Sequence, residues 1–234
     1  MDLRQTGIES NFYIRPQNAW LRSVQPLFEG SVDHDDAGRI QGWWWSPMID
    51  WQFQKQTHAF TMFDRWQERW HARDYTGHRF SLNVDNSQWR ALTVAFESEV
   101  GDGIWYGESD ADSYLGWLEQ YAAQATLRPS PRVTAELTAS RSRFSRDHGR
   151  GVLYDVWTLG AKTTWQFTRR LYARVYPQYD TEAEHLDADA LLGYVVHPGS
   201  VLYLGYNGDA DRIAGRHRVT GRTAFFKVSY LFQR

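Results

Sequence analysis

Residues Thr223 to Phe232 read T-A-F-F-K-V-S-Y-L-F and bring the chain to within two residues of its end. From Phe226 onward every second side chain is apolar or aromatic, while Lys227 and Ser229 alternate with them. Successive side chains of a strand point to opposite faces, so this segment has one apolar face and one polar face. Such a last strand is typical of an outer-membrane β-barrel, whose outer face meets lipid and whose polar side chains line the interior.

Three upstream segments alternate in the same way: Arg132–Ser140, Leu153–Phe167 and Arg170–Asp180. Gly42–Phe53 adds an expected outer face that is rich in tryptophan, Trp45 included, and Pro47 on this face predicts a bulge or bend. The segment Tyr114–Leu127 also fits a helix, but its place between a polar stretch and a proline-rich turn favours a strand. The repeated period of two predicts strands throughout.

The expected links between strands alternate in length. Short turns are expected at Pro16–Asn18, Gln54–Gln56, Asp85–Ser87, Pro129–Pro131, Thr168–Arg169 and His197–Gly199. Long polar loops are expected at Asp33–Gly38, His71–Gly77, Gly101–Asp112, Ser145–Arg150, Thr181–His185 and Gly208–Val219. Tight periplasmic turns opposite longer outer loops are typical of a barrel, whereas a β-sandwich has no reason to sort its loops by length.

The sequence therefore predicts an all-β, antiparallel, up-and-down outer-membrane β-barrel of about 12–14 strands. Residues 1–234 are expected to form a single transmembrane domain. The count comes to about thirteen, whereas bacterial single-chain barrels have an even number. Either a strand is missing upstream, so that the chain is the C-terminal portion of a larger barrel, or residues 1–18 are not a strand. We favour the first interpretation.

Composition agrees with this compartment. Aromatic residues make up 16 % of the 234 residues, with twelve tryptophans and thirteen tyrosines, while mean hydropathy is only −0.62. A barrel needs apolar residues only at alternate positions, so the two values are compatible. The net charge of −2 argues against a nucleic-acid partner. The chain has no cysteine, and its first residues lack the apolar core of a secretory signal.

Several segments also resemble a known family. They are Gly101–Tyr106, Ala125–Arg132, Thr164–Leu171, Gly193–Tyr206 and Arg222–Phe232. Their order is similar to the C-terminal barrel of a family of bacterial outer-membrane proteins of unassigned function (domain of unknown function 5916). In that family a carbohydrate-binding domain of the family 9 type precedes the barrel, and this chain has no counterpart of that domain. The resemblance implies a barrel, an association with glycans and no catalytic motif.

Candidate site residues are few. Trp105 and Tyr106, in the longest expected loop, are the aromatic residues best placed to contact a ligand such as a sugar ring. The charges expected on the interior wall are Arg65, Arg69, Glu97, Glu99, Arg170 and Arg174. Glu97 and Glu99 lie two apart on one strand face, which indicates a hydrated wall rather than the carboxylate pair of a glycosidase. No metal, cofactor or catalytic motif is recognisable.

The resulting hypothesis is an outer-membrane barrel that acts as a pore or platform for the uptake, export or binding of glycans or other solutes. Its expected partners are outer-membrane lipid, glycan ligands and the barrel-assembly machinery, which would recognise the strand from Thr223 to Phe232. The alternative is a membrane-embedded hydrolase of lipid or carbohydrate, built on a Ser/His/Asn or carboxylate cluster. A third, weaker hypothesis is a soluble β-rich binding domain with a second sheet over its aromatic faces.

Overall fold

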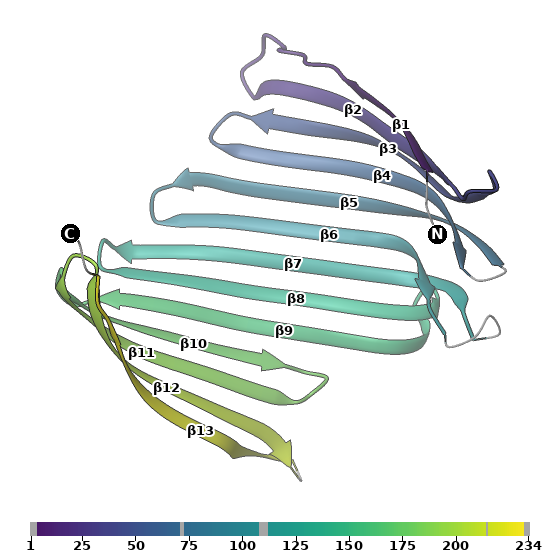
Figure 1. Ribbon diagram of the computed structural model, residues 1–234. Helices are drawn as coiled ribbons and strands as arrows, with labels where there is room; N and C mark the ends of the chain where they lie inside the picture. The colour runs from purple at the N-terminus through teal and green to yellow at the C-terminus, as the bar shows by residue number, and fades with distance from the viewer. Residues whose placement is uncertain (1–3, 71–72, 108–111, 214, 232–234) are drawn as a thin grey trace. The chain divides into compact units, whose positions relative to one another are not determined.

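A computed structural model describes residues 4–70, 73–107, 112–213 and 215–231. The described residues form thirteen strands in one antiparallel sheet, and each strand lies beside the next one in the chain (Figure 1). No helix long and apolar enough to cross a bilayer occurs in this part of the chain. The all-β, up-and-down fold and the predicted number of strands are confirmed.

The strands are long, and most contain 13 to 17 residues. Their bounds are β1 Arg4–Asn11, β2 Leu21–His34, β3 Ile40–Phe53, β4 Thr57–Trp70, β5 Arg73–Trp89, β6 Leu92–Trp105, β7 Tyr114–Ser130, β8 Val133–Asp147, β9 Arg150–Gln166, β10 Leu171–Asp180, β11 His185–His197, β12 Ser200–Ile213 and β13 Arg216–Ser229.

Several predicted loops are strand. β5 begins at Arg73 inside the expected loop His71–Gly77, and β12 and β13 take up most of Gly208–Val219. The predicted strict alternation of short and long links is therefore wrong. Polar residues extend these strands because the ladder needs only backbone N–H and C=O groups, whatever the side chains are.

Two expectations about single elements have clear outcomes. Tyr114–Leu127 lies within β7, so the choice of strand over helix is confirmed. The bulge expected at Pro47 is wrong, because the register of β2 and β3 runs through Phe28↔Pro47 and shifts only near Leu21 and near Asp33. The β3–β4 pairing resumes in the same register on both sides of Pro47. The missing N–H of proline thus leaves the register unchanged.

The chain divides into two compact units. The first comprises Met1–Gln88, Ala95–Ala122 and Arg141–Asp155. The second comprises Trp89–Val94, Ala123–Ser140 and Val156–Arg234.

In the first unit the strand register defines two faces. Directly paired residues share a face, so Trp45, opposite Arg65, and Phe63, opposite Phe80, belong to one side, which we call the ring face. The opposite side carries the pairs Trp44↔Trp66 and Asp64↔Arg79, and we call it the polar face. On the ring face, ring contacts with centroids 4.3 to 6.5 Å apart follow the order Phe28, Trp45, Phe63, His78, Trp117 and His148.

The second unit shows the same separation. Its apolar face carries the paired positions Val175, Ala190, Leu192, Leu204, Tyr206, Phe226 and Val228. These side chains stay open to the surroundings, with Leu204 57 % and Phe226 66 % exposed. The opposite face carries Arg174, Asp189 and Asn207. The two-faced last strand that the sequence predicts is present as far as Ser229, where β13 ends, and Phe232 lies outside the described residues.

Candidate functional site: the tryptophan pocket

A pocket of about 450 Å³ opens in the first unit, near the link between β2 and β3. We call it the tryptophan pocket. It is lined by Asp33, Gln41, Gly42, Trp43, Trp44, Asp64, Trp66, Gln67, Glu68 and Arg79. These residues come from β2, β3, β4 and β5, so the pocket is built on strands rather than on mobile loops. Two central pairs of the polar face, Trp44↔Trp66 and Asp64↔Arg79, belong to it.

Arg79 is held by several partners. Its Nη1 atom lies 3.1 Å from Oε1 of Glu99, and its Nε–H donates to the carbonyl oxygen of Asp102 at 3.2 Å. Its guanidinium also lies over the ring of Trp66, 5.3 Å from the centroid, in a cation–π contact. Gly77 leaves the space beside this ring, because a Cβ atom there would lie 2.4 Å from Cζ2 of Trp66.

Two carboxylates of the pocket accept hydrogen bonds from neutral hydroxyl groups. The Ser46 hydroxyl donates to Asp64, and the Tyr106 hydroxyl donates to both carboxylate oxygens of Glu68 at 3.1 Å. Burial, and then the charge of Glu68, raises the pKa of Tyr106 to about 12. Tyr106 therefore remains a protonated, neutral donor to Glu68 at neutral pH.

The turn beside the pocket is organised by Asp35, whose side chain is almost fully buried. Its carboxylate accepts bonds from the backbone N–H groups of Ala37 and Arg39 and from the Arg39 and Gln41 side chains, at 2.8 to 3.0 Å. These bonds, led by that from the Arg39 N–H, lower the pKa of Asp35. Gly38 has φ +74°, a left-handed backbone conformation that glycine adopts without strain, and it lies within this turn.

A second polar arrangement lies on the same face. His58 stands between two carboxylates, with Nε2 2.9 Å from Asp50 and Nδ1 3.0 Å from Asp85. His185 in the second unit likewise pairs with Asp211, at 2.6 Å. These histidines thus bond carboxylates rather than a serine or threonine hydroxyl. No group of three or more metal-binding side chains occurs among the described residues.

Two of the charges that the sequence predicted on the interior wall, Arg65 and Arg69, lie on the ring face. Arg65 lies on the ring face opposite Trp45, so the prediction that put Arg65 inward and Trp45 outward is wrong. Arg69 pairs with Asp74 on the same side, at the end of β4. The error arose because charge was taken as the guide to the face, whereas the register and the alternation within β4 decide it.

The other four charges that the sequence predicted on the interior wall lie on β6, on β10 and in the link between β9 and β10. Glu99 meets Arg79, and Glu97 lies two residues before it on β6. Arg174 faces Thr164 and Leu191 and lines a second pocket of about 400 Å³ with Lys162 and Asp189. Arg170 lies in the link between β9 and β10 rather than in a strand.

Both candidate ligand-contacting aromatics pack inside the first unit. Trp105 ends β6 and contacts the rings of Phe144 and Tyr154. Tyr106 packs edge-on against Trp70, with centroids 4.8 Å apart. Both rings thus have protein partners, yet Trp105 is 37 % and Tyr106 52 % exposed, and ligand contact by them stays a prediction. Sequence reasoning missed Trp44 as a site residue, although its even position in Gly42–Phe53 already predicted that it lies on the other face of the strand from Trp45.

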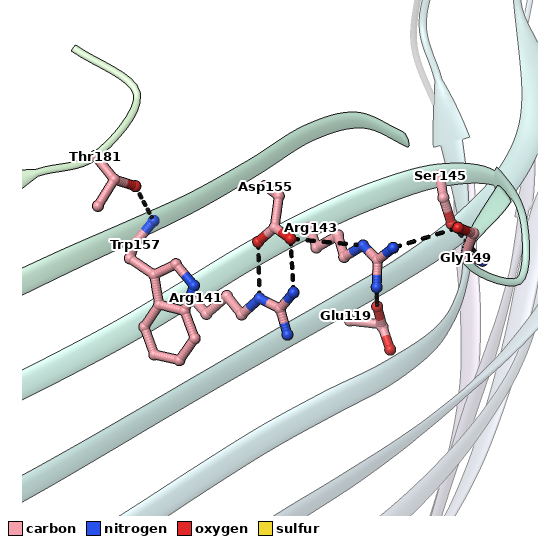
Figure 2. A network of polar contacts seen from close by, with 8 residues as sticks. All are labelled: Glu119, Arg141, Arg143, Ser145, Gly149, Asp155, Trp157 and Thr181. Atoms are coloured by element: carbon pink, nitrogen blue, oxygen red, sulfur yellow. Dashed lines mark hydrogen bonds and ion pairs between the residues drawn. The ribbon is translucent and has the colours of Figure 1, made fainter. Parts of the chain in front are cut away.

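A network of charges spans β7, β8 and β9 in the first unit (Figure 2). Arg141 makes two bonds to Asp155, at 2.7 and 2.6 Å, and Arg143 approaches both Asp155 and Glu119. The Arg143 side chain also donates to the Gly149 carbonyl oxygen, while the Gly149 N–H donates to Ser145. In the second unit the Trp157 N–H donates to the Thr181 hydroxyl. These contacts tie hairpin strands together.

No family model matches the chain, and no curated protein matches it. Among solved structures it is similar to the CymD monoaromatic hydrocarbon channel, at 9 % identity and a TM-score of 0.38, over 97 % of this chain and 86 % of that one. It is also similar to outer-membrane expressed OmpT of Vibrio cholerae, at 8 % identity and a TM-score of 0.36, over 97 % of this chain and 95 % of that one. No residue role is transferred at this level of similarity.

Proposed function

We propose that the chain is an integral outer-membrane β-barrel that serves as a pore or binding platform for hydrophilic solutes, glycans among them. The observation that carries this proposal is the exposed apolar face in each unit. Large side chains such as Phe80, Leu204 and Phe226 are 48 to 66 % exposed. Soluble monomers rarely leave extended apolar surface uncovered, whereas a membrane protein presents it to lipid.

Strand length supports the same proposal. A tilted strand needs roughly 9–11 residues to cross the hydrocarbon core, and most strands here contain 13 to 17. The excess would project beyond the bilayer and accommodate charges on the ring face such as Arg65 and Arg69. Closure of the sheet in the membrane would satisfy its edges, which is the condition for any strand structure in lipid.

The polar faces support a hydrated interior. Ion pairs such as Lys162–Glu136 at 3.0 Å and Arg79–Glu99 at 3.1 Å are each about one-third exposed. Side chains of this kind favour passage or binding of hydrophilic molecules over storage of an apolar ligand. Recognition of β13 by the barrel-assembly machinery is part of the proposal.

Reconstitution in a planar lipid bilayer tests the pore version. We expect stable conductance steps that neutral oligosaccharides reduce reversibly. Full-length protein that inserts and yet leaves the bilayer sealed would remove the pore and leave the platform. A chain that remains monomeric in buffer without detergent would remove the membrane assignment altogether.

A further inference from the structure

We propose that the tryptophan pocket binds the ammonium group of a small organic cation. Its walls carry three carboxylates, Asp33, Asp64 and Glu68, and one guanidinium, that of Arg79. Three negative charges and one positive charge leave a net charge of −2 on the lining. This inference goes beyond the proposed function, because binding here does not require an open pore.

The single positive charge is already engaged. Arg79 pairs with Glu99, which lies outside the lining, so the guanidinium does not neutralise the pocket carboxylates. Among the described residues, Asp64 and Glu68 accept hydrogen bonds from the hydroxyl groups of Ser46 and Tyr106, which bring no positive charge. An entering cation would thus meet uncompensated negative charge, and an anion would be repelled.

The indole rings favour the same ligand class. Arg79 lies over Trp66 in a cation–π contact inside the pocket, so an indole of the lining already binds a positive charge. Trp44 lines the pocket on the same face as Trp66 and is partly exposed, so its surface is accessible to a ligand. Rings and carboxylates together provide the two contacts by which proteins hold organic ammonium ions.

A further donor in the lining has no protein partner. Trp66 is only 8 % exposed, and its Nε1–H makes no hydrogen bond among the described residues. A buried donor of this kind is costly unless it is satisfied. A cation that also carries a hydroxyl oxygen, such as an amino alcohol or amino sugar, would supply both the charge and an acceptor. A volume of about 450 Å³ has room for such a molecule.

Calorimetric titration of the full chain in detergent micelles tests the inference with three probes of equal ring size. Glucosamine is cationic at pH 6.5, glucose is neutral and glucuronate is anionic. We expect glucosamine to bind at least tenfold more tightly than glucose, and glucuronate not to bind. Equal affinity for glucosamine and glucose, or no binding of glucosamine, would overturn the proposal.

Variants locate the binding site. Asp33→Asn and Glu68→Gln should each weaken glucosamine binding at least fivefold and leave glucose unaffected. Asp85→Asn is the matched control, because Asp85 lies on the same face, bonded to His58, and does not line the pocket. Equal losses in all three variants would contradict the assignment. If the protein leaves the bilayer sealed but still binds glucosamine, the result would contradict the pore and would support cation binding in the tryptophan pocket.

Discussion

At the scale of single residues, Asp35 shows how one side chain shapes the rim of the tryptophan pocket. Its carboxylate bonds the N–H groups of Ala37 and Arg39, and the next residues after this turn, Gln41 and Gly42, line the pocket. The turn therefore sets where β3 begins. Replacement of this carboxylate should loosen the rim and free the side chain of Gln41, which lines the pocket.

We predict that Asp35→Asn accelerates exchange of the Ala37 and Arg39 amide protons several-fold. The amide that replaces the carboxylate is a weaker acceptor and cannot pair with the Arg39 guanidinium. Hydrogen-exchange mass spectrometry of the turn measures the effect, with Asp36→Asn as control because Asp36 is exposed. Identical exchange in both variants would contradict this role.

The lowered pKa of Asp35 has a defined consequence for pH. The folded pKa lies below the ordinary value of about 3.9 for aspartate. Its stabilisation of the turn is therefore complete above that value and is lost as pH falls through the folded pKa. We expect turn exchange, corrected for intrinsic rates, to rise below about pH 4 in the native chain and to show no such rise in Asp35→Asn.

Tyr106 gives a prediction at high pH. Its pKa of about 12 lies above the ordinary value of about 10, so its contribution to stability is present below pH 10 and is lost as pH rises through about 12. Ultraviolet titration should show a tyrosine component that ionises near pH 12, and Tyr106→Phe should remove that component. Its persistence in the variant would assign the signal to another tyrosine.

At the scale of elements, each strand separates two environments, and neighbouring positions should respond differently to one substitution. Leu82 lies on the ring face opposite Thr61, and Asn83 lies on the polar face opposite Phe60. Leu82→Lys should lower the free energy of unfolding by about 2–4 kcal/mol, the cost of a lysine on the lipid face near the middle of a bilayer. Asn83→Lys should change stability little.

Urea unfolding of both variants in lipid vesicles measures this difference. Because the positions are adjacent on β5, differences in local strand stability cancel in the comparison. Equal costs for the two lysines would show that the ring face does not meet lipid.

The network in Figure 2 allows a test of hairpin energetics. Arg141 and Asp155 form a bidentate pair between β8 and β9, and both side chains are partly exposed. A double-mutant cycle with Arg141→Gln and Asp155→Asn should give a coupling energy of up to about 1 kcal/mol, since exposure limits such pairs. A coupling of zero would mean that solvent screens the pair completely.

Alternation within a strand could be read from the sequence, and this explains which expectations succeeded. The apolar side of β13, with Phe226 and Val228, follows directly from a period of two. The pairing of Arg65 with Trp45 could not be read, because it depends on the register between β3 and β4. A slip of one residue would exchange the two faces, and the sequence of one strand carries little information about it.

The pocket was missed for the same reason. Trp44, Trp66 and Arg79 come from three strands, and only the register brings them together. The predicted long loops failed because polar stretches such as Gly208–Val219 were taken to end strands. They instead continue them, since backbone pairing tolerates polar side chains.

At the scale of the whole molecule, the proposed membrane function depends on whether the apolar faces of the sheet meet lipid. Exposed rings and aliphatic side chains gather on one face of each unit, while the pairs Arg79–Glu99 and Lys162–Glu136 lie on the other. Lipid outside and water inside would explain this separation, with Arg69–Asp74 on the ring face at the end of β4. The same pattern in a soluble protein would require a second protein layer over the ring face of the first unit and over the apolar face of the second. The lipid assignment is therefore the claim on which pore, platform and solute selection all rest.

Site-directed spin labelling of β12 in lipid vesicles tests it most directly, since the chain contains no cysteine to interfere. Single cysteines at 201 to 206 would be labelled in turn, and collision with oxygen, which dissolves in lipid, compared with collision with a water-soluble nickel complex. We predict that labels at positions 202, 204 and 206 collide more often with oxygen and that labels at positions 201, 203 and 205 collide more often with the nickel complex. Labels at 202, 204 and 206 that neither reagent reaches would place these side chains in a dry protein interior and contradict the account.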